Sequence, residues 1–228
     1  MVQYANYCYE GYMTQVNKKE AFKYFKLAAD KGNFYSMFFV AKMLYRGDGG
    51  ITINKEEASV YFKKAAEFRK KAMYKYALMK YKGDGVPMNK EESLKYFKLG
   101  AKKGDGKSMF YYAKMLYEGD GGASINKKKA CKYFKKAADE YIVKAMLRYA
   151  IMKRDGDGVQ INMDDSIEYF KMAAENGSSY AYDNLVLMSK KIGVDYCKDI
   201  NFNNDAERKE VSNIDENNEK KSQEEWWW

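Results

Sequence analysis

Residues 53–67 read INKEEASVYFKKAAE, and this stretch decides the fold. Asn54 is a residue type that caps helix N-termini, and the two glutamates after Lys55 suit the first turn of a helix. Apolar residues then recur at spacings of three and four, which places Ala58, Tyr61, Phe62, Ala65 and Ala66 on one face. The stretch therefore predicts an amphipathic helix of about 13 residues that buries one face.

The same pattern returns along the chain with a period of about 36 residues. A Tyr-Phe pair marks each copy, and a pair of small residues follows it. The Tyr-Phe pairs begin at Tyr24, Tyr61, Tyr96, Tyr133 and Tyr169. Gly-Asp-Gly loops, which begin at Gly47, Gly83, Gly119 and Gly156, precede the later copies. Such self-similarity predicts an array of similar units in which each unit buries its apolar face against its neighbours.

Each unit contains a second helical pattern ahead of its Gly-Asp-Gly loop. In residues 108–119, SMFYYAKMLYEG, one stripe holds Ser108, Tyr112, Ala113, Met115 and Leu116, and Gly119 suits a left-handed C-cap. Short turns join the helices, so neighbouring helices are expected to run antiparallel. The sequence therefore predicts an all-α solenoid of about five helix pairs over residues 1–194, followed by a tail.

Composition narrows the class of protein. The 228 residues include one proline and no histidine, so helix breakers are scarce and the commonest general base is missing. Cys8, Cys131 and Cys197 form no C-x-x-C motif, which favours neither a disulfide framework nor a zinc site. The start of the chain lacks a signal-peptide pattern, and no apolar run approaches the roughly 18 residues of a membrane span. We therefore expect a cytoplasmic, non-enzymatic protein without a cofactor or metal.

One stretch imitates a nucleotide-binding loop. Residues 100–109 read GAKKGDGKSM and end in the Gly-Lys-Ser typical of a phosphate loop. The first glycine of that motif is replaced by Ala101, and the preceding residues predict a helix where the motif needs a strand. The alignment of the repeats places the stretch in the turn between two helices, so Lys107 is expected to bind no nucleotide.

A second stretch imitates a calcium loop. Residues 154–165 read RDGDGVQINMDD, in which Asp155 and Asp157 match the first two ligand positions of an EF-hand. Val159 and Gln160 then occupy positions where that loop needs a ligand and a glycine. We therefore expect the loop aspartates to serve capping and turn geometry.

The repeat resembles the Sel-one-like repeat, a relative of the tetratricopeptide repeat with a slightly longer period. The resemblance covers about residues 2–190 and rests on the Gly-x-Gly loop, the asparagine before the second helix, and the Tyr-Phe-x-x-Ala-Ala pattern. The chain departs from the family in its alanines where glycine is common, namely Ala5, Ala41, Ala77, Ala113 and Ala150. The resemblance implies a right-handed α/α solenoid that serves as an adaptor between proteins.

In tetratricopeptide-like stacks the first helix of each pair lines the concave side, so the candidate partner-binding residues lie on these helices. They are Phe39, Lys42, Tyr45, Lys75, Tyr81, Tyr111, Lys114, Tyr117 and Arg148. One interpretation is that the aromatic residues pack against the adjacent unit and the lysines are merely solvated. The other is a groove for an extended or helical protein segment, acidic rather than basic, with aromatic anchors and steering charges.

RNA or another polyanion is the alternative partner, because many proteins bind single-stranded nucleic acids by stacking the bases on tyrosine or phenylalanine beside lysine. The net charge of +9 is compatible with it. Only five of the 41 basic residues are arginine, and the tail is acidic, so we favour a protein partner.

The repeat pattern fails near residue 195. Residues 195–228 contain too few apolar residues to fold, which predicts a disordered tail. It ends in Trp226, Trp227 and Trp228, which could dock into the groove, sit at a membrane surface or mark a chance end. At the other end, the chain begins inside a first helix without a polar cap, which is compatible with an N-terminal truncation or with a dimer contact.

Overall fold

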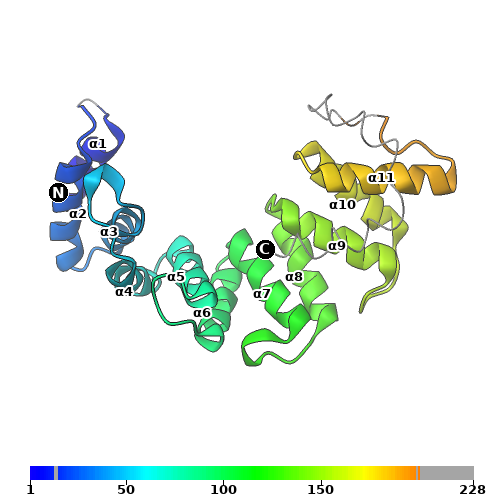
Figure 1. Cartoon of the computed structure of the whole chain (residues 1–228), viewed down its shortest axis with the longest axis horizontal. Coiled ribbons are helices and arrows are strands. Elements are labelled where there is room, and N and C mark those ends of the chain that lie inside the picture. The colour runs from blue at the N-terminus through cyan, green and yellow to red at the C-terminus, as the bar shows by residue number, and fades with distance from the viewer. Residues whose placement is uncertain (13–14, 199, 201–228) are drawn as a thin grey trace. The chain divides into compact units, whose positions relative to one another are not determined.

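The computed structural model describes residues 1–12, 15–198 and 200, and this part of the chain is built from α-helices without a β-strand (Figure 1). The helices are α1 Val2–Glu10, α2 Lys18–Asp30, α3 Phe34–Arg46, α4 Lys55–Ala65, α5 Lys70–Lys82, α6 Lys90–Lys102, α7 Gly106–Glu118, α8 Lys127–Asp139, α9 Val143–Asp155, α10 Met163–Glu175 and α11 Ser179–Ile192. Two short 3-10 turns, Asp48–Gly50 and Asp120–Gly122, lie in the Gly-Asp-Gly loops. The all-α expectation is confirmed.

The asparagines act as the sequence predicts. The side chain of Asn54 accepts a hydrogen bond from the backbone N–H of Glu57 at 3.0 Å, which satisfies a donor that the first turn of α4 leaves open. The equivalent caps are Asn17, Asn89, Asn126 and Asn162. At the other end of the pair, first helices such as α5 stop at a glycine in the left-handed conformation, Gly83 with φ 68°.

The phenylalanine of each Tyr-Phe pair forms the centre of the core. Phe25, Phe62, Phe97, Phe134 and Phe170 are each no more than 1% exposed. The small pair that follows, Ala65 at the end of α4 and its C-cap Ala66, is also buried and lets the neighbouring helix approach closely. The periodic apolar face of the sequence is therefore the face that the helices bury.

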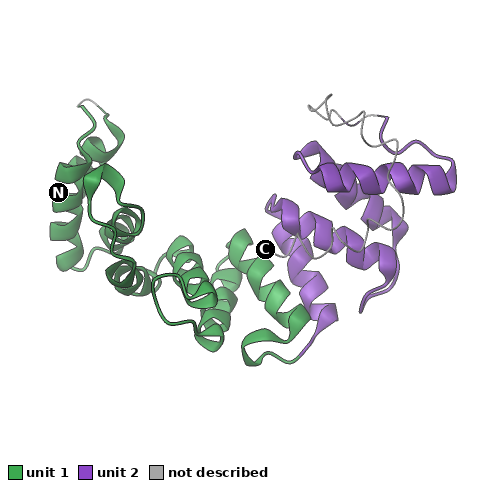
Figure 2. Cartoon of the chain, in the orientation of Figure 1, with its two compact units in different colours: residues 1–124 green, residues 125–228 purple. Residues whose placement is uncertain are grey.

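The described helices group into two compact units, residues 1–124 and residues 125–228 (Figure 2). The first holds α1 to α7 and the second α8 to α11, and in each unit consecutive helices pack side by side. The division falls between α7 and α8, which the repeat pattern assigns to one helix pair. None of the described helices combines the length and the apolar character that crossing a membrane requires.

The solenoid is expected to end at residue 194, and the structure describes a short segment beyond it. The backbone N–H of Tyr196 donates to Ser189 Oγ in α11 at 3.0 Å, and Ile200 is buried. The predicted disordered tail beyond it, with Trp226, Trp227 and Trp228, lies outside the described residues.

Each Gly-Asp-Gly loop connects the two helices of one pair, and its aspartate can contact the preceding pair. Asp84 accepts a hydrogen bond from the hydroxyl of Tyr45 and pairs with Lys55 Nζ at 2.6 Å, and both partners belong to the preceding helix pair. Ion pairs at the same place in other repeats are Lys90 with Asp120 at 2.9 Å and Lys127 with Asp157 at 2.6 Å. The loop aspartates are structural, as the sequence predicts, and they act between repeats as well as within their own turn.

The ion pair of Asp84 gives a pH-dependent prediction. The hydrogen bonds from Lys55 and Tyr45 hold the pKa of Asp84 below its usual value. Such a group stabilises the fold fully above the pKa of the unfolded chain, about 3.9, and loses that effect as pH falls through the lower folded pKa.

We expect Asp84→Asn to lower the free energy of unfolding at pH 7, because the charge that faces Lys55 is lost. The deficit should begin to shrink as pH falls below about 4, where Asp84 is protonated in the unfolded chain, and it should vanish once the pH lies below the lower pKa of the folded state. Urea unfolding of both proteins from pH 7 to pH 3 measures this, and a deficit that is constant over the range would contradict the assignment.

Candidate protein-binding surface

The Gly-Lys-Ser sequence that resembles a nucleotide-binding loop lies at the N-terminus of a helix. Gly106, Lys107 and Ser108 form the first turn of α7, where Asp105 caps the helix. Its carboxylate accepts hydrogen bonds from the backbone N–H of Ser108 at 2.8 Å and from Ser108 Oγ at 2.6 Å. The helix N-terminus, where a phosphate would bind, is therefore occupied by the chain's own carboxylate.

The two aspartates of the stretch that resembles a calcium loop form ion pairs within the chain. Asp157 pairs with Lys127, and Asp155 pairs with Arg154 Nε at 2.7 Å. Over the described residues, no group of three acidic, cysteine or histidine side chains is placed to hold a metal ion.

Four of the sequence-predicted partner-binding residues line one hollow of about 370 Å³ in the first unit, between α3 and α5. They are Phe39, Lys42, Tyr45 and Lys75. The sequence reasoning missed the other lining residues, which are Tyr35, Phe38, Arg46, Phe62, Arg69 and Lys71. We call this site the α3–α5 hollow. Most of the missed residues neighbour the predicted ones on α3 and α5, and Arg69 comes from the turn before α5.

Aromatic rings form the floor of the α3–α5 hollow and also pack against the adjacent helix pair. Phe39 stacks on Phe25 with ring centroids 4.9 Å apart, and it contacts Tyr9 at 5.5 Å and Tyr35 at 4.7 Å. Tyr45 is held by its hydrogen bond to Asp84, which contributes to raising its pKa to about 12. Phe39 therefore packs between repeats, and both Phe39 and Tyr45 remain partly exposed.

Cationic groups cover these rings. Lys42 Nζ lies 5.0 Å from the ring centre of Tyr9 and 5.6 Å from that of Phe39. The guanidinium of Arg69 lies 4.8 Å from the ring centre of Tyr35, and its Nε is buried without a hydrogen-bond partner in the described structure. These distances are those of cation–π contacts.

The positive charge of the α3–α5 hollow is not balanced by carboxylates of the described residues. Its lining includes five basic side chains and, among the described residues, no acidic one. None of the five forms an ion pair with another described residue. Burial lowers the pKa of Lys75, and the positive charges of Arg46, Lys107 and Lys42 lower it further. An anionic group placed here would be attracted by every one of these side chains.

Three further candidate residues form a second aromatic cluster along the same unit. Tyr111 stacks on Phe97 with ring centroids 4.9 Å apart and contacts the edge of Tyr81 at 5.7 Å. Lys114 Nζ lies 5.7 Å from the ring centre of Tyr81, but the residue is only 5% exposed. This cluster therefore offers a partner less accessible charge than the α3–α5 hollow does.

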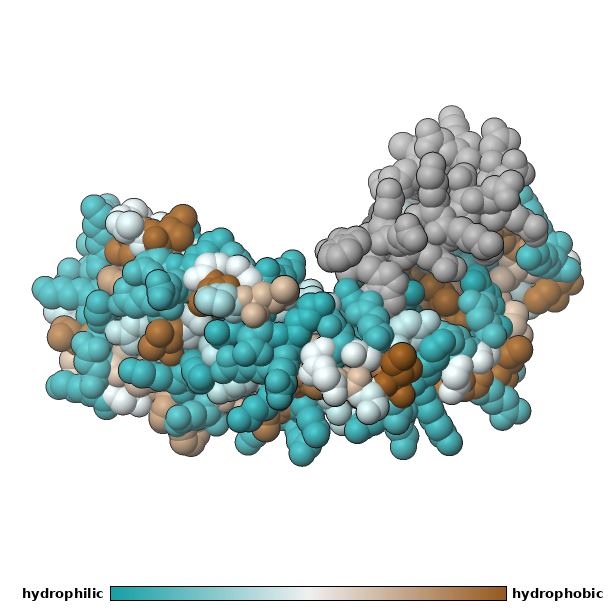
Figure 3. Space-filling view, turned by 60° about the horizontal axis from the view of Figure 1, so that its bottom comes forward, coloured by the Kyte–Doolittle hydropathy of each residue, from teal (hydrophilic) through white to brown (hydrophobic). Residues whose placement is uncertain are grey.

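The last two candidate residues are Tyr117 and Arg148. Tyr117 is half-buried near the end of α7, and Arg148 is half-buried on α9 in the second unit. On the face shown in Figure 3, hydrophilic side chains predominate and hydrophobic ones form separate patches. At the α3–α5 hollow itself, basic side chains lie above aromatic rings.

Comparisons with known proteins agree with the repeat pattern. The Sel1 repeat family model matches residues 1–33, 34–67, 70–105, 106–141 and 143–178. A comparison with curated protein sequences finds no match.

Two solved structures share the fold. One is a protective antigen present in uropathogenic Escherichia coli strains that displays an SLR fold, with a TM-score of 0.77 and 23% identity over 84% of this chain. The chain spans only 41% of that protein. The other is a Sel1 repeat protein from Oxalobacter formigenes, with a TM-score of 0.72 and 24% identity over 82% of this chain and 76% of that one.

The five family matches cover most of the chain and coincide with the helix pairs of the structure. Proteins built from Sel1 repeats are generally protein–protein interaction scaffolds, and they are typically non-enzymatic. The resemblance noted in the sequence is confirmed, and this chain belongs to the Sel1 repeat family.

Proposed function

We propose that this chain is a protein–protein interaction scaffold and that its α3–α5 hollow binds an acidic, partly apolar segment of a partner protein. One observation carries the proposal: five basic side chains line the hollow above aromatic rings, and no described carboxylate pairs with them. A partner carboxylate would supply the missing counter-charge, and an apolar side chain beside it would cover the exposed ring faces.

The electrostatics of Lys75 support an anionic occupant. Its pKa is lowered by burial and by neighbouring positive charges, so the charged form is held there at a cost in free energy. A carboxylate within about 4–6 Å would reverse this effect and favour the charged form. The energy released would contribute to binding the partner.

The size of the hollow fits a short segment rather than a whole domain. Its volume of about 370 Å³ is near the lower end of the range for ligand pockets, about 300–1,000 Å³. The floor is rigid because its rings are packed against Phe25 and Tyr9, so little side-chain entropy is lost when a partner binds.

The test begins with affinity purification of the full chain from its native cells and identification of the co-purified protein. Surface plasmon resonance then compares wild-type protein with the double variant Lys42→Glu/Lys75→Glu. We expect at least a tenfold loss of affinity for this partner, caused mainly by slower association, because both substitutions reverse the charge that steers the partner. The variant should fold, since it relieves repulsion among the basic side chains.

The matched control is Lys64→Glu/Lys98→Glu, which changes the net charge equally at exposed positions of α4 and α6. It should change the affinity by less than about twofold, the size of effect typical of a distant surface charge. Equal losses in the two variants would exclude the α3–α5 hollow as the site. Tighter binding of single-stranded RNA than of the captured protein would favour the polyanion alternative instead.

A further inference from the structure

The helix α8 departs from the pattern of the other second helices. Their first turns carry acidic residues, among them Glu20, Glu57, Glu92 and Asp165, whereas α8 begins with three lysines at 127–129 and has no acidic residue there. Positive charge at a helix N-terminus is unfavourable because the helix dipole is positive there. In sister helices the acidic residue also forms bridges between repeats, such as Lys63 with Glu92 at 3.0 Å. In α8 the first turn therefore lacks a feature that stabilises its sister helices.

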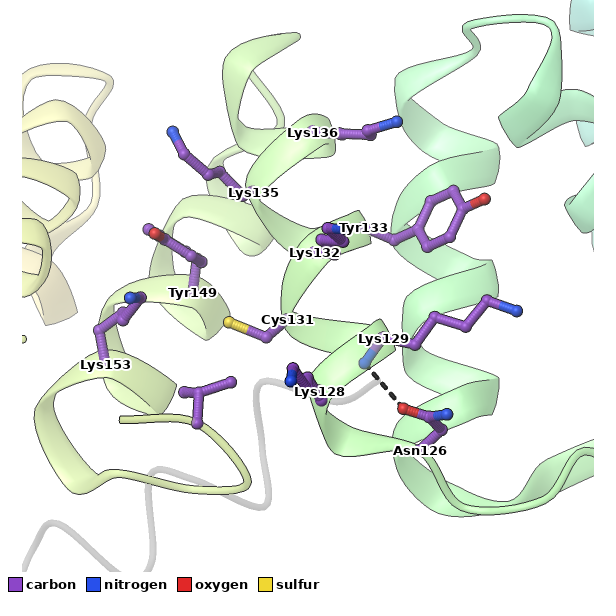
Figure 4. Close-up of a pocket in the computed structure, with 11 residues that line it drawn as sticks. Asn126, Lys128, Lys129, Cys131, Lys132, Tyr133, Lys135, Lys136, Tyr149 and Lys153 are labelled. Carbon is purple, nitrogen blue, oxygen red and sulfur yellow. Dashed lines mark hydrogen bonds between the residues drawn. The ribbon is translucent and has the colours of Figure 1, made fainter. Parts of the chain in front are cut away.

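Six lysines surround a hollow of about 730 Å³ at this helix, which lies in the second unit (Figure 4). They are Lys128, Lys129, Lys132, Lys135 and Lys136 of α8 and Lys153 of α9. We call them the α8 lysine face. None of the described residues that line the hollow is acidic. The hollow is about twice as large as the α3–α5 hollow and belongs to a different unit.

Two of these lysines lie close to carboxylates of described residues. Lys153 pairs with Asp165 at 3.1 Å, and Lys135 lies 3.7 Å from Asp139. Lys128 and Lys132 are exposed and form no ion pair with another described residue. In Figure 4, Lys135 and Lys153 lie on one side of α8, whereas Lys136 lies on the other. The face thus presents positive charge across the width of the helix.

We propose that the α8 lysine face docks an extended acidic segment of a partner protein, as a second site separate from the α3–α5 hollow. The inference rests on the proposed scaffold function. Lys128, Lys132 and Lys136 recur every four residues, so they advance about 6 Å per step along the helix axis. Alternate residues of an extended chain are spaced about 6.6 Å apart on one side. An acidic residue at every second position therefore matches the lysine spacing.

The side chains around the hollow fit a protein segment better than a nucleic acid. None of the described residues that line the hollow is an arginine, so they offer a phosphate no bidentate guanidinium contact. Of the two lining tyrosines, Tyr149 is 4% exposed, and its hydroxyl donates to Asp165 at 2.8 Å. The described lining residues therefore offer no row of exposed rings on which successive bases could stack.

The test uses a fluorescein-labelled decapeptide of alternating glutamate and serine, with the same peptide containing glutamine as the neutral probe. Fluorescence anisotropy at low salt follows its binding to the full chain. We expect binding of the acidic peptide, at least tenfold weaker binding of the neutral one, and at least a tenfold loss of acidic-peptide affinity in Lys128→Glu/Lys132→Glu. Lys128→Glu places a carboxylate in the first turn where α4, α6 and α10 carry Glu56, Glu91 and Asp164, so the melting temperature of this variant should not fall.

The matched control is Lys19→Glu/Lys23→Glu, which makes the same change at the equivalent positions of α2 and should alter affinity less than twofold. Equal losses in both variants, or no binding of the acidic peptide at millimolar concentration, would overturn the inference. Tighter binding of a ten-nucleotide uridine RNA would overturn it in favour of nucleic acid. Loss in Lys42→Glu/Lys75→Glu alone would assign the peptide to the α3–α5 hollow, which would overturn the second site and leave the proposed function standing.

Discussion

Replacement of Phe97 by alanine should lower the free energy of unfolding by about 3–5 kcal/mol, the range measured for buried phenylalanines in well-packed cores. Phe97 is 0% exposed, and its ring stacks on Tyr111 and contacts the rings of Tyr74 and Tyr81. Because these rings come from α5 and α7 on either side of α6, truncation leaves a cavity between consecutive helix pairs. Urea unfolding followed by circular dichroism measures the loss.

Leu99→Ala is the control for this prediction. Leu99 lies on the same helix but is 39% exposed, so its truncation should cost no more than about 1 kcal/mol. Losses of the same size at both positions would mean that the core does not lie on the face that the Tyr-Phe pattern marks.

Gly85→Ala should cost on the order of 2–4 kcal/mol, from backbone strain and overpacking together. Gly85 has φ 72°, a conformation that residues with a Cβ rarely adopt. A Cβ at this position would also lie 2.1 Å from Lys55 Cβ, an atom that side-chain rotation cannot move away. The loop would have to lift from α4 and would weaken the ion pair of Lys55 with Asp84.

Gly122→Ala separates the two causes of that loss. Gly122 has φ 78°, but a Cβ there would meet nothing within 4 Å, so only the backbone strain of about 1–2 kcal/mol applies. Thermal unfolding of both variants measures the difference. If Gly85→Ala were no more harmful than Gly122→Ala, the close approach of the loop to α4 would not be a determinant of stability.

The helices could be predicted from sequence because each position of the repeat recurs in several copies. Asn54 alone is weak evidence for the start of a helix. Asparagines recur at the same position of the other repeats, as do the Tyr-Phe pairs, and together they define the helix boundaries. The burial of Phe62 and its counterparts follows from the same periodicity, because a helix pair cannot bury its apolar face without a neighbour.

The α3–α5 hollow could be predicted only in part. Periodicity places Phe39, Lys42 and Lys75 on first-helix faces, but it does not say which side chains meet across helix pairs. Arg69 was missed because it lies in the turn between α4 and α5, where the sequence is one residue shorter than the corresponding turn before α3. That deletion is the signal that could have marked the turn as different.

The roles of individual polar atoms could not be predicted because they depend on tertiary contacts. The sequence predicts Tyr45 to be an exposed anchor for a partner, whereas in the structure its hydroxyl donates a hydrogen bond to Asp84 of the next helix pair. The sequence predicts Lys114 to lie on the surface, whereas the structure buries it. Five residues of the α8 lysine face lie close together in the sequence, at 128–136, but only the structure shows that Lys153 from the next helix lines the same hollow.

The most direct test of the scaffold function is photo-crosslinking of the captured partner from a single position in the hollow. Benzoylphenylalanine replaces Lys71, an exposed residue that lines the α3–α5 hollow, and in a second protein it replaces Lys64 on α4 as the control. If the partner binds in the α3–α5 hollow, irradiation should crosslink it at position 71 and not at position 64. Crosslinking at position 64 without crosslinking at position 71 would contradict the proposed binding site.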